Sequence, residues 1–291
     1  MADPNVIVGL GEVLWDLLPD GARFGGAPAN FACSSQQVAQ GRYSTAMASA
    51  VGKDALGDTA LQELRQRGVD VSCVAQNAYP TGQVHVSLDE NGKASYRFED
   101  NCAWDNLTWT DEWDRLAEST AAVCFGSLGQ RSAPSRHVIQ RFVESTPADS
   151  LRIFDINLRW PFVDDQAVLD SLERTNVLKL SDEELPYLAK LCQFEGSPET
   201  VLDSLATRYQ LRQVALTCGE DGALLWSDGK VFRSAGIKTN VVDTIGAGDA
   251  FTATMAVGLL DGMQPQALVE QACRVAAYVC SQSGATPRIP L

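Results

Sequence analysis

Short, continuous apolar runs alternate along this chain with longer segments in which apolar residues recur every three or four positions. The first pattern is typical of buried strands, and the second is typical of amphipathic helices. The predicted strands are Val6–Leu10, Thr45–Val51, Ala121–Phe125, Leu151–Ile156, Asn176–Leu180 and Val214–Thr217. The predicted helices are Ala29–Gln40, a segment capped by Asp54 that ends at Gly68, Pro134–Glu144, Gln166–Arg174, Asp182–Leu191, Pro198–Tyr209, Ala250–Leu260 and Pro265–Ser281.

Alternating strands and helices predict an α/β fold, in which a mostly parallel sheet is covered by helices on both faces. Ligands bind such sheets at the carboxyl ends of the strands. The segments Gln83–Leu88 and Ala94–Phe98 interrupt the alternation, because they flank the turn Asp89–Gly92 and predict a hairpin. This hairpin is either a small flap over the site or a decoration at the sheet edge. Ala223–Trp226 and Val231–Arg233 predict a second hairpin.

Composition and charge narrow the class of protein. The 291 residues are 45% hydrophobic, which is enough for one large domain. The net charge of −14 argues against nucleic acid and anionic membranes as partners, so an anionic ligand would need local cationic or dipolar groups. No run of 18 apolar residues occurs, and the first residues lack the features of a signal peptide, so we expect a cytoplasmic protein.

Cysteine and histidine offer little for metal or nucleophilic chemistry. Eight cysteines are scattered without a CxxC pair, which favours buried thiols in a reducing cytosol. The two histidines, His85 and His137, fall in a predicted strand and a predicted helix. A zinc site or a histidine-based triad therefore has few candidate residues.

The segment Asp243–Phe251, with sequence DTIGAGDAF, carries the strongest chemical signal. Gly246 and Gly248 flank Ala247 just before a predicted helix, where free N–H groups and the helix dipole favour a phosphate. Asp249 adds a carboxylate suited to a general base, although a helix N-terminus should keep it a weak one. The alternative is a capped turn. No GxxxxGK[ST] or GxGxxG motif occurs elsewhere, which favours this segment as the phosphate site.

Other polar groups follow predicted strands. The loop from Thr217 through Gly219 to Gly222 would lie against a nucleotide, or it would be a simple hairpin turn. Arg159 would brace a phosphoryl group with its forked donors, or it would form a surface salt bridge.

Two further sets have structural alternatives. Gly25 and Gly26 precede Asn30, and with Asp16 they would suit the hydroxyls of a sugar or polyol; the alternative is a glycine turn with a satisfied Asn. Ser181 and Glu184 have the spacing of a capping box. Glu184 would contact the hydrated magnesium of MgATP only if it does not fold back onto that cap.

These motifs together resemble the ribokinase-like (PfkB) family of carbohydrate kinases nearly end to end, in that family's order and approximate spacing. The matching elements are GGAPAN, DINLR, KLSDEE, TCGEDG and DTIGAGDAF, and GEVLWDLLPDG with GGAPANFA is most similar to bacterial fructokinases. The resemblance implies a single domain over residues 1–291, with a three-layer α/β/α core. It also implies a small β-sheet lid formed by segments near 11–30 and 77–105.

The resemblance assigns a role to each motif residue. Asp249 would be the base, Gly246, Ala247 and Gly248 the anion hole, and Arg159 a contact to the phosphoryl group or substrate. The sugar would lie on Asp16, Gly25, Gly26, Asn30 and Asp249. ATP would lie on Thr217, Gly219, Gly222, Gly246 and Gly248. Glu184 would reach Mg²⁺ through water, and Asp243 would help to order a monovalent cation, usually K⁺. The chain departs from the family at Ser181, where Asn is common, and at Cys273, where Asn or His is common near the adenine.

Three functional hypotheses follow. The first is an ATP-dependent fructokinase, the second a kinase of ribose, 2-keto-3-deoxygluconate or a nucleoside, and the third a non-catalytic binding protein with the same fold. Phe98 and Trp104 are aromatic candidates for contact with the sugar, or they belong to the core of the lid. Pairing of two lid sheets would bury their exposed edges, which favours a homodimer.

Overall fold

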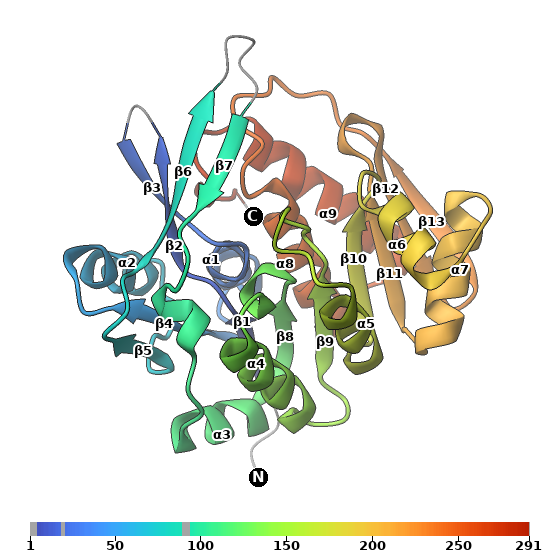
Figure 1. Ribbon diagram of the computed structural model, residues 1–291. Helices are drawn as coiled ribbons and strands as arrows, with labels where there is room; N and C mark the ends of the chain where they lie inside the picture. The colour runs from blue at the N-terminus through green and yellow to red at the C-terminus, as the bar shows by residue number, and fades with distance from the viewer. Residues whose placement is uncertain (1–4, 19–20, 89–93, 291) are drawn as a thin grey trace.

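A nine-stranded sheet forms the centre of the molecule in the computed structural model, which describes residues 5–18, 21–88 and 94–290 (Figure 1). Its strand order within these residues is β13-β12-β11-β10-β9-β8-β1-β4-β5. The strands are β1 (Val6–Leu10), β4 (Ser44–Gly52), β5 (Val74–Asn77), β8 (Thr120–Phe125), β9 (Leu151–Asp155), β10 (Val177–Ser181), β11 (Gln213–Thr217), β12 (Gly222–Ser227) and β13 (Lys230–Ala235). The seven strands β11, β10, β9, β8, β1, β4 and β5 pair in parallel, whereas β12 and β13 form an antiparallel edge beside β11.

Helices cover both faces of this sheet. They are α1 (Ala27–Ala39), α2 (Ala55–Gln66), α3 (Asp111–Glu118), α4 (Ala133–Ser145), α5 (Asp165–Arg174), α6 (Leu185–Cys192), α7 (Pro198–Tyr209), α8 (Ala247–Leu260) and α9 (Pro265–Cys280). Short 3-10 turns occupy Ala103–Asn106, Leu128–Gln130 and Gly219–Asp221. Helices α3 to α7 bury their apolar side chains on one face, and α1, α2, α8 and α9 bury theirs on the other. The three-layer α/β architecture predicted from the sequence is confirmed.

Alternation along the strands explains the two core layers. Ile7 contributes to one hydrophobic cluster and the next residue, Val8, to the other, as expected where successive side chains point to opposite faces. Every residue of β8 is buried, which is the pattern of a central parallel strand covered on both sides. No helix of the described residues is long and apolar enough to span a membrane.

A second, four-stranded sheet stands beside the carboxyl edge of the core, and we call it the lid (Figure 1). Its order is β3-β2-β6-β7, built from β2 (Leu14–Leu18), β3 (Gly21–Gly25), β6 (Gly82–Leu88) and β7 (Ala94–Phe98). Two antiparallel hairpins meet through a parallel pairing of β2 with β6. The predicted β6–β7 hairpin is confirmed, although its turn, Asp89–Gly92, lies outside the described residues. The apolar pattern alone does not indicate β2 and β3, because Gly21, Gly25 and Gly26 interrupt it, although the resemblance implied lid strands near residues 11–30.

Candidate active site

Two cavities open along the carboxyl edge of the core sheet and meet at the start of α8. One, of about 730 Å³, lies between the lid and the core, and we call it the sugar cavity after the ligand predicted for its residues. The other, of about 1070 Å³, lies between α8, α9 and the loop after β13, and we call it the nucleotide cavity for the same reason. Glu183, Thr244 and Gly248 line both. A group transferred between ligands in the two cavities would therefore pass beside Gly248.

Backbone crowding explains the glycines at the start of α8. Gly246 caps the helix with φ of 80°, and a Cβ there would lie 2.1 Å from the carbonyl oxygen of Ala285. Only glycine fits both the left-handed conformation and this close approach. The helix then begins at Ala247, whose N–H donates to the Thr244 carbonyl at 3.3 Å, and the N–H groups of Gly248 and Asp249 that follow have no intrahelical partner. This arrangement suits an anion.

Asp249 lies in the first turn of α8 and lines the sugar cavity. Its Oδ2 accepts a hydrogen bond of 2.8 Å from Nδ2 of Asn30, which joins α1 to α8. Burial, and then the charge of Asp155, raise the pKa of Asp249 from 3.8 to about 7. The expectation that the helix N-terminus would make this carboxylate a weak base is wrong, because desolvation exceeds the stabilising interactions.

A buried ion pair lies beneath Asp249, and the sequence analysis did not identify it. Nζ of Lys179 lies 3.0 Å from Oδ1 of Asp155, and the Thr252 hydroxyl lies 3.0 Å from Oδ2 of the same carboxylate. Burial lowers the pKa of Lys179, but Asp155 and Glu184 outweigh that effect, so the ammonium stays charged. A Cβ on Gly248 would lie 3.2 Å from this Nζ, which places a positive charge beside the start of α8. The sequence sign of a buried charge was the lysine inside the apolar run VLKL.

The predicted sugar ligands converge on the sugar cavity with one exception. Asp16, Gly26, Asn30 and Arg159 line it, together with Phe98 of the lid. Gly25 does not line it, but a Cβ there would lie 2.7 Å from Oδ2 of Asp16, so this glycine makes room for that carboxylate. Burial raises the pKa of Asp16 to about 6. Trp104 is buried and packs under the guanidinium of Arg131, so it belongs to the core beneath the lid.

Glu12 is a second functional candidate that the sequence analysis missed. It follows β1, lines the sugar cavity and is 2% exposed. Burial raises the pKa of this carboxyl to about 7, against the opposing charge of Arg159 and the backbone hydrogen bonds it accepts. The polar residue directly after the apolar run VIVGLG was the only sequence signal.

The nucleotide cavity contains the predicted strand-end loop. Thr217, Gly219 and Gly222 all line it, at the carboxyl end of β11. The same loop connects β11 to the antiparallel strand β12 through a 3-10 turn. The hairpin turn is therefore also a wall of this cavity, and the contact of its residues with a nucleotide stays a prediction.

Comparison with known proteins identifies the family. A family model described as pfkB family carbohydrate kinase matches residues 21–290. The chain belongs to the PfkB family of carbohydrate kinases. An uncharacterised sugar kinase of Pyrococcus horikoshii is 31% identical to this PfkB kinase, over 98% of this chain and 93% of the relative. The crystal structure of that relative in complex with ATP has a TM-score of 0.83 and covers 98% of this chain and 95% of its own.

Two fructokinases are also similar to this PfkB kinase. The Escherichia coli fructokinase is 29% identical, over 97% of this chain and 95% of the relative. The crystal structure of a fructokinase from Vibrio cholerae O395, in a form with bound fructose, ADP and calcium ion, has a TM-score of 0.81. It is 25% identical and covers 99% of this chain and 96% of its own.

The two predicted metal ligands of this PfkB kinase line neither cavity. Glu184 folds back, since its Oε2 accepts from the Ser181 N–H at 2.8 Å and its Oε1 from the Leu158 N–H at 2.8 Å. Glu184 was expected to contact hydrated magnesium only if it did not fold back onto Ser181, and it does fold back. Ser181 ends β10 rather than capping a helix, and the acidic side chain that lines both cavities is Glu183.

Asp243 is similarly occupied. Its Oδ1 accepts from the Ile245 N–H at 3.0 Å, and its Oδ2 accepts from the Gly284 N–H at 3.2 Å. Nη1 of Arg23, on lid strand β3, lies 3.6 Å from the same Oδ2. A guanidinium therefore lies beside the carboxylate that was expected to help order a monovalent cation, and that role of Asp243 stays a prediction.

Proposed function

We propose that this PfkB carbohydrate kinase transfers the γ-phosphoryl group of ATP to a hydroxyl of fructose, with Asp249 as the general base. The observation that carries the proposal is the position of Asp249. Its carboxylate lines the sugar cavity one residue from Gly248, where the two cavities meet, and its pKa of about 7 suits proton transfer near neutral pH.

The geometry supports a direct transfer. The sugar hydroxyl attacks the γ-phosphorus while Asp249 accepts its proton, and ADP leaves toward the nucleotide cavity. The N–H groups of Gly246 to Gly248 and the ammonium of Lys179 would balance the charge on the transferred group, and Arg159 would brace it from the sugar cavity. Closure of the lid over the sugar would exclude water, which is the competing acceptor.

Magnesium would accompany the nucleotide and supply positive charge to its phosphates. Mg²⁺ keeps most of its ligands as water and phosphate oxygens, so a few nearby carboxylates are enough. Asp182 and Glu183 line the nucleotide cavity and fit that requirement. Glu184 would contribute only through the lone pairs that its two backbone hydrogen bonds leave open.

Fructose is favoured by the two fructokinases described above, together with the GEVLWDLLPDG segment that forms part of the lid. The alternatives are ribose, 2-keto-3-deoxygluconate or a nucleoside, since Phe98 is the aromatic lid residue placed in the cavity and one ring does not specify a sugar. A panel of these sugars with ADP detection, with and without K⁺, separates them. Fructose should give the highest kcat/KM; a higher value for another sugar would reassign the substrate.

The first prediction concerns Asp249→Asn. We expect binding of sugar and ATP to persist, while turnover falls by about 10²-fold or more, because the amide cannot accept the proton. Calorimetry measures the binding and coupled ADP detection measures the turnover. Near-normal turnover would remove Asp249 from the base role. ATP binding without ADP formation by the unmodified protein, across the whole sugar panel, would favour a non-catalytic binding protein.

A homodimer through the lid stays part of the proposal. Strands β3 and β7 form the edges of the lid sheet, and pairing with a second copy would satisfy their free backbone groups. Sedimentation velocity measures the oligomeric state directly, and a single monomeric species at micromolar concentration would contradict it.

A further inference from the structure

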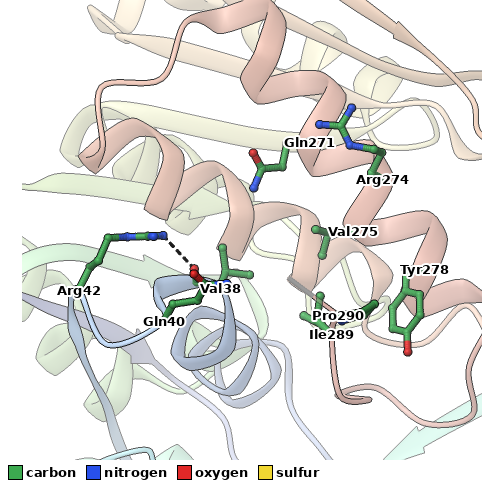
Figure 2. A pocket seen from close by; sticks show the side chains of 9 residues that line it. All are labelled: Val38, Gln40, Arg42, Gln271, Arg274, Val275, Tyr278, Ile289 and Pro290. Carbon is green, nitrogen blue, oxygen red and sulfur yellow. Dashed lines mark hydrogen bonds between the residues drawn. The ribbon is translucent and has the colours of Figure 1, made fainter.

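A third cavity, of about 390 Å³, lies between the end of α1 and α9, and we call it the rear cavity (Figure 2). Four residues of α9 line it, and they are Gln271, Arg274, Val275 and Tyr278. These positions are three or four residues apart and share one face of the helix, whereas the α9 residues that line the nucleotide cavity share the opposite face. Those residues are Cys273, Ala276, Ala277 and Cys280. A ligand in the rear cavity would therefore be separate from the nucleotide.

Buried apolar side chains and a few polar ones give the rear cavity the character of a small-molecule site. Its buried side chains are those of Val38, Val275 and Ile289, which are 3%, 5% and 8% exposed. The amide of Gln271 and the phenol of Tyr278 add hydrogen-bonding groups to this lining. Sites for small molecules combine an apolar lining with a few polar groups, in a volume of about 300–1,000 Å³.

The charged side chains that line the rear cavity are both positive, although the chain as a whole has a net charge of −14. They are Arg42, which follows α1, and Arg274 of α9, and Figure 2 shows them apart with Gln271 between them. Arg274 pairs with no carboxylate of the described residues. Nη2 of Arg42 lies 3.3 Å from Oδ2 of Asp261, but a guanidinium has five N–H donors, so others remain for a ligand. Two separated guanidiniums suit a ligand with an anionic group at each end.

A segment of residues 284–290 connects the rear cavity to the anion site. Ile289 and Pro290 line the cavity at one end of this segment. Near its other end the Ala285 carbonyl lies against Gly246, where an added Cβ would meet its oxygen at 2.1 Å. A ligand that packs on Ile289 would therefore touch the same segment that positions the start of α8.

Two side chains hold this segment in place between its ends. Nε2 of Gln37 on α1 donates to the Pro287 carbonyl at 3.1 Å, and Oε1 of the same amide accepts from the Ile289 N–H at 2.9 Å. Nε of Arg67 donates to the Thr286 hydroxyl at 3.1 Å. Because these hydrogen bonds fix the segment along its length, a change at the rear cavity would reach the anion site through it.

We propose that the rear cavity binds a small organic phosphate with two phosphate groups, and that this ligand strengthens nucleotide binding at the start of α8. Arg42 and Arg274 each bind one phosphate group through their forked N–H donors, and the amide of Gln271 binds a hydroxyl between them. The ligand also covers Ile289 and thereby holds the segment against the anion site. Binding at the rear cavity goes beyond the proposed kinase function, and its effect on the nucleotide rests on that function.

Calorimetry tests the site with fructose 1,6-bisphosphate as the probe, in saturating fructose so that the sugar cavity is filled. We expect a Kd of about 1 mM or below, and Arg274→Ala should weaken binding by about tenfold or more, because charge-assisted hydrogen bonds are lost. Arg212→Ala is the matched control, since it removes an exposed arginine before β11 and should leave the Kd within about twofold. A probe that fails to bind the unmodified protein, binds Arg274→Ala equally well, or is displaced by fructose would overturn the site.

The number of phosphate groups is tested with fructose 1-phosphate, which carries only one. It should bind about tenfold or more weakly than the bisphosphate, because only one of the two guanidiniums is then engaged. Equal affinities of the two sugar phosphates would show that a single phosphate group is enough, and would overturn the assignment of both arginines to the ligand.

The effect on the nucleotide is measured by calorimetry with ADP, in the absence and in the presence of saturating bisphosphate. The affinity for ADP should rise by about fivefold or more, and ADP should raise the affinity for the bisphosphate by the same factor, since coupling is reciprocal. Gln37→Leu removes both hydrogen bonds to the segment and should reduce the effect to less than about twofold, while the bisphosphate still binds. An unchanged affinity for ADP would overturn the effect. If the bisphosphate binds but no sugar is phosphorylated, the kinase proposal fails and the site stands.

Discussion

At the scale of single residues, burial decides the chemistry of the carboxyl groups in the sugar cavity. Burial raises the pKa of Asp16 to about 6 and the pKa values of Glu12 and Asp249 to about 7. Each carboxyl would be fully ionised in water at neutral pH. In the protein they titrate in the range where the enzyme would work. Beneath them Lys179 lies 3.0 Å from Asp155, whose own pKa is also raised by burial.

The activity should therefore depend on pH through Asp249. Its proton must be absent for the carboxylate to act as a base, so we expect kcat/KM to rise with pH and to level off above about 7. Initial rates at low sugar concentration between pH 5.5 and 8.5 measure this profile. A flat profile across that range would show that no group with a raised pKa limits the free enzyme.

The free energy of unfolding should fall as pH rises, whereas the activity should increase. A carboxyl whose pKa is raised by folding stabilises the native state fully below its unfolded pKa, and that stabilisation is lost as pH rises through the folded value. The raised pKa values of Asp16, Glu12 and Asp249 thus predict that the unfolding temperature falls between pH 5 and 8. In Asp249→Asn this fall should be smaller, because one of the three groups no longer titrates.

At the scale of elements, helix α8 determines where the anion site lies. Its cap, Gly246, is held against the carbonyl of Ala285, so the C-terminal segment fixes the direction of the first N–H groups. Ala250 and Phe251 then anchor the helix in two different hydrophobic clusters. The start of α8 is therefore positioned by contacts on both sides as well as by the glycines in its own sequence.

Gly246→Ala tests this arrangement. The added Cβ would lie 2.1 Å from the Ala285 oxygen, so we expect the helix start to move, ATP affinity to fall at least tenfold and stability to fall by roughly 1–3 kcal/mol. Gly262→Ala is the control, because its φ of 69° is similarly unfavourable for alanine but its Cβ would meet no atom within 4 Å. Equal losses of ATP affinity in both variants would contradict a specific role for the start of α8.

At the scale of the whole molecule, the lid and the core share the sugar cavity. Asp16 and Phe98 line it from the lid, whereas Asn30 and Asp249 line it from the core. The ion pair between Arg23 on β3 and Asp243 links the lid directly to the loop before α8. Sugar binding and the order of the anion-binding loop would thus be coupled through the position of the lid.

Arg23→Ala should weaken this link. Exposed ion pairs contribute about 0–1 kcal/mol, so we expect KM for the sugar to rise by about two- to fivefold with little change in kcat. Arg115→Ala is the control, since it removes an exposed pair with Glu112 on α3. If turnover by Arg23→Ala requires K⁺ while turnover by the unmodified protein does not, then the Arg23 guanidinium replaces a bound cation beside Asp243. An unchanged KM for the sugar would contradict the coupling.

The sequence by itself determined the layered fold and most of the site. Helix and strand periodicity depend on neighbouring residues, so the helices and strands could be predicted. The glycine motifs that begin α8 and follow β11 depend on local backbone geometry, so these motifs could be predicted as well. Thr217, Asn30, Arg159 and Asp249 all proved to line the two cavities for this reason. The alternation of strands and helices placed them at one edge of the sheet.

Only the tertiary structure decided how these groups behave. The pKa of Asp249 depends on burial and on Asp155, which is 94 positions earlier in the chain. The lid exists because β2 pairs in parallel with β6, and Asp243 meets Arg23 because the lid stands over the loop. Desolvation, long-range pairing and ion pairs between distant segments arise only when the chain is folded. For that reason the roles of Lys179 and Glu12 and the hydrogen bond from Leu158 to Glu184 could not be inferred from spacing.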